Sequence, residues 1–325
     1  SIKDYVLGLK DNIHVLRAGE VVISSRKSQI KVKKVSLRPE QVQERYMADI
    51  DADFNYVFVP EINITNTNIK QVYFNNILNI EKVQLLTPKI KVIKNKKRSL
   101  KDKAKEGEFT GVDLYSLIEG KLKSVSIQLF TISESSMKMF KTPRDAEPTY
   151  TAGSLSILME RFQLDSNSYK NKTKILYADD IDLTILDYHM RLKDKIHELH
   201  AEKLMISTDQ SKIFAENVSL KPNYRAAWQK NKRRTLYSLS FPRLQINGAD
   251  LHRAYNFADL PVAKLLLLNP QMNVNRYEQL RKKDRKKTKS KNNIYQLVSY
   301  YLNSLTINEI ELRDGRFDFS NFNHS

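Results

Sequence analysis

Apolar and polar residues alternate with a period of two in many short segments of this chain. In residues 124–129 (SVSIQL), Val, Ile and Leu alternate with Ser and Gln, and residues 61–64 and 217–220 alternate in the same way. This period is typical of a β-strand with one apolar face. Short polar breaks separate the segments: Ser25–Lys27, Thr65–Asn68, Thr208–Gln210, Ser133–Ser136 and Arg313–Arg316. The pattern predicts antiparallel meanders, with a hairpin turn at Asp314-Gly315.

Helical periodicity is confined to a few places. Apolar residues recur at three- and four-residue spacing in Leu114–Lys121 and Ile294–Leu302, which predicts a short helix in each segment. A further short helix is expected after Pro39, and none elsewhere.

An internal repeat organises the chain. Residues 9–39 and 192–222 are identical at fifteen of 31 positions, and Pro60 and Pro88 correspond to Pro242 and Pro270 further along. The copies predict three parts: a first β-unit at 1–142, a connecting part at 143–183 that occurs once, and a second β-unit at 184–325. Since both units begin or end part-way through the repeat, we expect the natural chain to continue in both directions.

The predicted fold class is therefore mainly all-β, a sheet of meander repeats with one short helix per repeat. A sheet with one apolar face must cover that face, and the sequence supplies no large helical layer. The apolar face either forms a closed sandwich core, as in a structural or adhesive repeat protein, or lines a groove for another molecule.

The cadence of residues 175–222 and 302–319 resembles the AsmA/TamB-like proteins of bacterial envelopes. Strings such as L-x-x-L-x-I-x-x-I-x-L-x-D-G-x-F and I-x-A-x-x-V-x-L-x-P recur in that family. The resemblance implies an elongated, twisted sheet folded into a groove that carries phospholipids across the periplasm. It also implies an inner-membrane anchor, which would lie outside residues 1–325.

A lipid groove would be lined by the apolar positions of the alternating segments. The candidate lining residues are Ile62, Ile64, Val125, Ile127, Leu129, Ile213, Val218, Leu220, Leu244 and Ile246. Acyl chains would lie along them, each buried CH₂ contributing about 0.8 kcal/mol. Phospholipid or another acyl lipid is the expected partner.

Charge adds a second candidate contact. Residues 94–105, 230–234 and 281–291 together carry +17 of the formal net charge of +18. These runs are solvated loops, contacts to anionic lipid head groups or contacts to nucleic acid. Nucleic acid is disfavoured because the runs contain no aromatic residues for base stacking. The candidate contacts to an anionic surface are Lys96, Lys97, Arg98, Lys282, Lys283, Arg285, Lys286 and Lys287.

No pattern of catalytic or metal-binding residues stands out. The chain has no Cys and only eight Gly, and it contains no P-loop, dinucleotide fingerprint or nucleophile elbow. His197 and His200 lie three apart, but Arg17 replaces the second His in the other copy. Asp179, Asp180 and Asp182 lack the Gly turn and terminal Glu of a calcium loop. We expect no enzyme, metal or cofactor, and a structural role for both groups.

Overall fold

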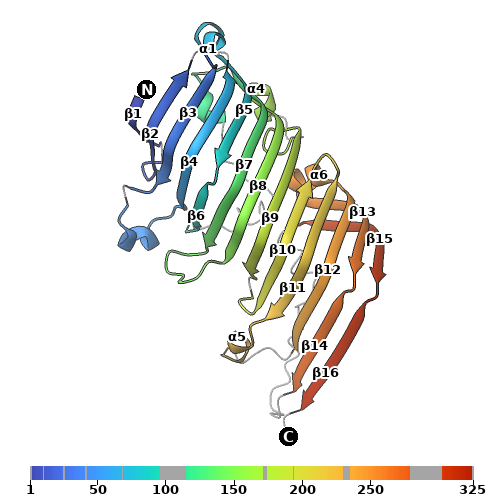
Figure 1. Ribbon diagram of the computed structural model, residues 1–325. Coiled ribbons are helices and arrows are strands. Elements are labelled where there is room, and N and C mark those ends of the chain that lie inside the picture. Colours follow the sequence, from blue (N-terminus) through green and yellow to red (C-terminus); the bar gives the residue numbers. More distant parts are fainter. Residues whose placement is uncertain are drawn as a thin grey trace.

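The strands of the protein form one large sheet. The computed structural model describes residues 2–9, 11–24, 26–40, 42–67, 69–95, 115–170, 174–192, 194–229, 235–278 and 302–323. Sixteen strands from these residues are hydrogen-bonded side by side, so the mainly all-β prediction is confirmed (Figure 1). Most neighbouring strands are antiparallel.

The first half of the sheet runs from β1 to β8 in chain order. These strands are β1 (Ile2–Gly8), β2 (Val15–Ser24), β3 (Gln29–Arg38), β4 (Phe54–Thr67), β5 (Ile77–Leu86), β6 (Lys89–Ile93), β7 (Ser124–Phe140) and β8 (Tyr150–Asp165). Strands β5 and β6 both lie between β4 and β7 in one register, so they are two segments of one long strand.

The second half begins at β9 and repeats the arrangement of β1 to β7. Its strands are β9 (Asp180–Arg191), β10 (His197–Ser207), β11 (Lys212–Pro222), β12 (Thr235–Ala249), β13 (Asp259–Leu268), β14 (Gln271–Glu278), β15 (Ser304–Arg313) and β16 (Arg316–Asn323). Strands β13 and β14 both pair with β12, as β5 and β6 pair with β4. The two copies therefore contribute equivalent sets of strands to one sheet.

Two features of the predicted meander are wrong. Strand β7 is parallel to β5 and β6, and β15 and β16 are parallel to β13 and β14. Asp314-Gly315 is not a hairpin turn: β15 and β16 run on in one direction, since they pair with β13 and β14 at the same offset. The Asp-Gly dipeptide favours a turn, but here it lies inside a long strand because the segments on both sides of it pair with β13 and β14, two consecutive segments of the neighbouring strand.

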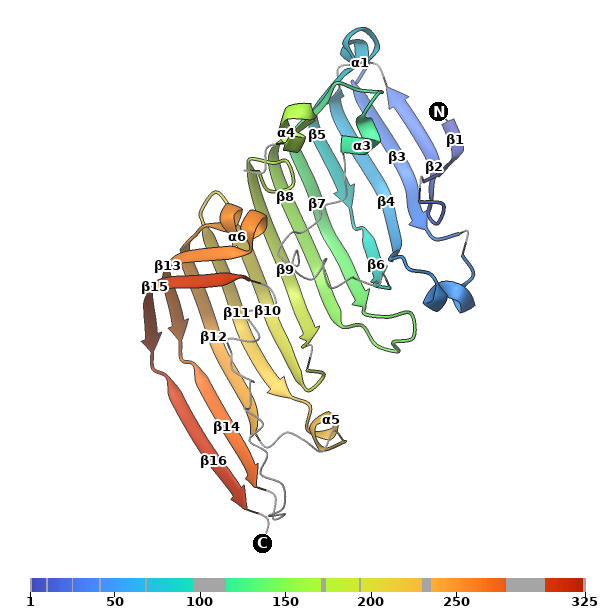
Figure 2. The same cartoon turned by 180° about the vertical axis from the view of Figure 1, so that it is seen from behind.

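The helices are short and lie at the ends of the strands. They are the 3-10 helix η1 (Glu44–Asp49) and the α-helices α1 (Ile69–Asn75), α3 (Tyr115–Ile118), α4 (Ser166–Lys170), α5 (Tyr224–Gln229) and α6 (Leu251–Phe257). Helices α1, α4 and α6 lie at one end of the strands and α5 at the other (Figure 2). The helices cap the sheet without forming a layer over it.

The helix predictions are confirmed in part. Helix α3 falls within Leu114–Lys121, and η1 follows Pro39, as expected. Ile294–Leu302 lies outside the described residues except for Leu302. The expectation of one short helix per repeat is wrong, because α1, α4, α5 and α6 are additional. For α6 a local pattern existed: the Asp250 side chain accepts a hydrogen bond from the Arg253 N–H and caps the helix.

A line of left-handed residues crosses the sheet. One residue on each of eight strand segments or their junctions has φ between 46° and 54°: Asp4, Lys34, Thr87, Glu134, Asp187, Asn217, Asn269 and Asp314. The intervening strands place Gly19, Pro60, Gly153, Glu202 and Pro242 near the same level, and the pairing skips these positions. Proline is tolerated here because the ladder needs no N–H at an interruption.

A second, shorter interruption lies nearer the end that carries α1 and α6. Asn66, Arg161 and Gly248 have φ of 54°, 52° and 62°, and the pairing skips their partners too. A left-handed residue breaks the strict alternation of side chains. Across such a residue, side chains three apart in sequence face the same side, so Ala215 and Val218 pack in one cluster.

The described residues form an extended single layer. Each of the hydrophobic clusters joins strands that lie close together in the sheet, or joins them to the short helices and loops at their ends. No second sheet stacks on the first among the described residues.

The second interruption offers a test of the backbone geometry. At Gly248 an added Cβ would lie 2.6 Å from the Ala263 Cβ, and φ is already 62°. We expect Gly248→Ala to lower the free energy of unfolding by about 1–3 kcal/mol, measured by urea denaturation. Gly8→Ala is the control, since no atom lies within 4 Å of its added Cβ. Equal stability of the two variants would contradict this account.

Candidate functional site

A continuous row of aliphatic side chains crosses the whole sheet. The strand registers place one residue from each of thirteen successive strands opposite the next, and all have side chains on the same face. In order from β1 to β15 this apolar row is Ile2, Val21, Val32, Ile62, Leu85, Ile132, Ile157, Leu183, Ile206, Ile213, Ile246, Leu265 and Ile310. Every member is Ile, Leu or Val.

A second apolar row lies across the line of left-handed residues. It runs from β1 to β10 through Leu7, Leu16, Leu37, Val57, Ile90, Met137, Ala152, Tyr188 and Ala201. One cluster contains Ile157 and Leu183 of the first row together with Met137, Ala152 and Tyr188 of the second. The two rows therefore belong to one side of the sheet, which we call the apolar face.

The opposite side carries a polar row one residue away. From β2 to β15 it consists of Val22, Lys31, Asn63, Gln84, Thr131, Leu158, Asp182, Ser207, Lys212, Asn247, Lys264 and Glu309. Only Val22 and Leu158 are apolar. The contrast between adjacent rows gives the sheet one wettable side and one apolar side.

The apolar row is not buried. Its eleven inner members are half-buried, and Ile2 and Ile310 at the ends are 55% and 58% exposed. Burying an Ile or Leu side chain completely contributes about 1.5–3 kcal/mol, and this row obtains only part of that. A closed sandwich core would bury these residues, and the described residues do not form one.

Most of the predicted lining residues lie on the apolar face. Ile62, Ile213 and Ile246 belong to the apolar row, and Ile64 follows on the same face between Ile30 and Val83. The other lining residues of the second unit lie in or beside the cluster of Ala201 and Phe241. This cluster contains Val218 and Leu244. Leu220 pairs with two of its members, Leu199 and Leu239.

The segment with Val125, Ile127 and Leu129 does not keep simple alternation. Ile127 pairs with Ile80 and is equivalent to Ile307, which packs with Ile213 and Ile246. Val125, two residues away, is buried. Leu129 pairs instead with Lys82 and Glu160, in the polar surroundings of the other side. Leu129 therefore does not belong with the predicted lining residues. The interruption opposite Arg161 falls between Leu129 and Ile127, so these two side chains lie on opposite sides of the sheet.

Sequence reasoning missed most of the apolar row. Val32, Leu85, Ile157, Leu183 and Leu265 were not among the candidates, because which residues stand opposite one another cannot be read from alternation alone. Pro60 and Pro88 of the first copy correspond to Pro242 and Pro270 of the second, which indicated that a structural feature recurs at these positions. The sequence did not show that this feature is an interruption of the strand pairing.

The buried histidines are structural. His197 is 4% exposed; its Nδ1 lies 2.6 Å from Asp194 Oδ2, and its Nε2 accepts a hydrogen bond from the Tyr237 N–H. His14 repeats this with Asp11 at 2.6 Å and the Asn55 N–H at 2.9 Å. Each Asp–His pair ties the loop before a strand (β2 or β10) to the next strand but one in the sheet (β4 or β12), which explains the recurring Asp-x-x-His.

His197 and His200 do not form a site together. His200 is exposed, and its Nε2 lies 3.2 Å from Asp187 Oδ1 on the neighbouring strand. Among the residues that the structure describes, no group of three His, Asp or Glu side chains could hold a metal ion.

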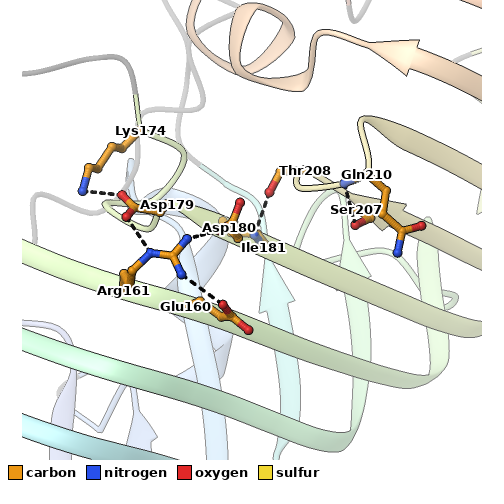
Figure 3. Close-up of polar contacts among 9 residues, drawn as sticks. All are labelled: Glu160, Arg161, Lys174, Asp179, Asp180, Ile181, Ser207, Thr208 and Gln210. Carbon is orange, nitrogen blue, oxygen red and sulfur yellow. Dashed lines mark hydrogen bonds and ion pairs between the residues drawn. The ribbon is translucent and has the colours of Figure 1, made fainter.

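The aspartates at the start of β9 are neutralised by basic side chains (Figure 3). Arg161 Nε lies 2.9 Å from Asp179, its Nη2 contacts Asp180, and Lys174 Nζ lies 2.5 Å from Asp179. The hydrogen bond from Lys174, aided by Arg161, lowers the pKa of Asp179 below its usual value. These carboxylates form a surface ion-pair network, with Asp182 exposed beyond it.

The candidate anionic-surface contacts, residues 96–98 and 282–287, all lie outside the described residues. No helix in the described part of the chain is long and apolar enough to cross a membrane. No family model and no curated protein matches the chain.

The Asp194–His197 pair gives a stability prediction. Burial alone would raise the pKa of Asp194, but hydrogen bonds from the His197 side chain and from the N–H groups of His197 and Ile196 lower it below its usual value. We expect Asp194→Ala to lower the free energy of unfolding at pH 7 by about 2 kcal/mol, measured by urea denaturation.

The effect should depend on pH. Since the folded-state pKa is depressed, the stabilisation is present above the ordinary carboxyl pKa of about 3.9 and is lost as pH falls below it. The difference between wild type and Asp194→Ala should therefore narrow in acid. Asp11→Ala is the matched control and should cost less, because Asp11 is 43% exposed. A difference that does not change with pH would exclude this role for the carboxylate.

Proposed function

We propose that this protein binds the acyl chains of lipids along its apolar face. The observation that carries the proposal is the apolar row, which is continuous over thirteen strands, partly exposed along its length and exposed at both ends. Large exposed apolar surfaces on soluble proteins mark binding sites for other molecules. A row without a polar side chain offers no hydrogen-bonding partner to a polar ligand, so it suits hydrocarbon.

The length of the row favours several chains or a moving chain over one fixed ligand. Thirteen strands at about 4.8 Å spacing span roughly 58 Å. One leaflet of a bilayer is about 15 Å of hydrocarbon, so the row is several acyl chains long. Its Ile, Leu and Val side chains are chemically alike at every step, so a chain sliding along the row exchanges equivalent contacts. Passive lipid transport follows from such a surface.

The resemblance to AsmA/TamB-like proteins supports the same proposal and suggests a place for it. The protein would act in the periplasm of a bacterial envelope, in lipid transport or outer-membrane biogenesis, held near the inner membrane by a segment outside residues 1–325. Its basic runs would contact anionic head groups. No catalysis is needed, because acyl-chain transfer along a surface makes and breaks no covalent bond.

The binding face can be tested with adjacent residues that point to opposite sides. A photo-crosslinking amino acid is placed at Ile157 or Leu265 on the apolar row, and at Leu158 or Leu266 on the other side as matched controls. Leu266 pairs with Gln245 and Glu311. The protein is illuminated with phospholipid vesicles, and adducts are identified by mass spectrometry. We expect lipid adducts at Ile157 and Leu265 and few at the controls.

A second measurement asks whether the apolar row is needed for binding. Ile157→Asp should reduce the phospholipid retained in native mass spectrometry several-fold, whereas Leu158→Asp should leave it unchanged; circular dichroism verifies that both fold. Adducts distributed equally over both sides, or a clean lipid-free protein throughout, would reject the proposal. A structural spacer with a closed core would give that result.

A further inference from the structure

The edge of the sheet formed by β15 and β16 exposes large apolar side chains. Strand β15 pairs with β13, and β16 with β14, so the other side of both has no strand partner among the described residues. Leu312 is 60% exposed and Phe317 63%. The same edge exposes Leu305, Ile310 and Phe319. We call β15 and β16 together the free edge.

The repeat shows what covers the equivalent edge inside the sheet. Leu85 pairs with Ile132 as Leu267 pairs with Leu312, so β7 occupies the place of β15 and β16 in the first unit. On its far side β7 is covered by β8, which is antiparallel to it. Ile132 is half-buried there, whereas Leu312 is exposed.

We infer that the free edge is an acceptor for an added β-strand of the β8 type. The partner is an extended polypeptide segment, antiparallel to β15 and β16, with apolar residues on the side that meets the apolar face. This surface adjoins the proposed lipid-binding row, whose last member is Ile310, but it binds a different ligand because it also uses the backbone groups of an edge strand. Strand addition of this kind is a common mode of peptide recognition.

The side chains of the free edge match those of β8. In the register of β7 with β8, Ile132 faces Ile157, Met137 faces Ala152 and Met139 faces Tyr150. By the repeat, Leu312 would face an Ile, Phe317 a small Ala and Phe319 a Tyr. A large ring opposite a methyl group, and one aromatic beside another, are favourable cross-strand pairs.

The free edge also lacks Lys and Pro, two of the residues that most often protect an edge strand. Natural edges commonly carry Lys or Pro that discourage pairing. Strands β15 and β16 contain neither, in SLTINEIELR and RFDFSNFN. The interruption at Asp314 recurs in β7 at Glu134, where β8 still pairs on both sides of it. An interrupted edge is therefore compatible with a partner strand.

Engineered cysteines test this inference, because the chain has none of its own. A synthetic peptide of residues 150–165 carries Ile157→Cys, and the full chain carries Leu312→Cys. Under mild oxidation we expect a disulfide between them, identified by mass spectrometry. The control peptide carries Leu158→Cys, whose side chain points to the other side of the sheet, and should cross-link at least about tenfold more slowly.

Binding is measured separately with a fluorescent peptide of residues 150–165 and delipidated protein. Ile310→Asp, at the exposed edge, should weaken binding about tenfold by removing one apolar cross-strand contact. Phe74→Asp on α1 is the control, because Phe74 is also exposed, at 76%, but lies away from the edge, and it should not weaken binding.

Equal cross-linking by both peptides, or equal binding of the two protein variants, would overturn the inference. A scrambled peptide that binds as well as the β8 sequence would also overturn it. Loss of lipid binding would not, because none of these measurements contains lipid.

Discussion

The continuous hydrogen-bonded register of the strands is the constraint on which this structure depends. Side chains alternate with a period of two, so a slip of one residue between any two strands would move the rest of the apolar row to the polar side. Twelve successive pairings keep Ile, Leu or Val opposite one another instead. The apolar face thus results from cumulative register, to which each strand contributes one side chain.

The left-handed interruptions follow from the same constraint. In long strands such as β7, apolar residues alternate with polar ones in each half, but the two halves are out of phase by one residue. With strict alternation, the apolar side chains of one half would therefore point to the polar side. One residue with positive φ resets the phase, at a cost of order 1–2 kcal/mol for a residue with a side chain. Lys34 and Glu134 have no local preference for this conformation. Their recurrence at one level indicates that neighbouring strands impose it on one another.

Several polar groups in the described part of the chain hold the sheet together. Asp194 with His197, and Asp11 with His14, fasten loops to the next strand but one in the sheet, and Arg161 neutralises the aspartates that begin β9. The His pair and the aspartates could be considered for metal binding only while their partners in the folded protein were unknown. Among the described residues, their contacts do not involve the apolar face or the free edge, which are the two surfaces on which our proposals of hydrocarbon binding and strand addition rest.

The sequence by itself determined the repeat, the strand-rich fold and the apolar character of one side of each strand, because these follow from local period and composition. It also placed nine of the ten candidate lining residues on the apolar face, and failed at Leu129, where the phase shifts. Only the tertiary structure decided the parallel neighbours, the short helices at the strand ends and the apolar row. Register and positive φ depend on contacts between residues tens of positions apart, so the local alternation that predicted the strands could not specify them.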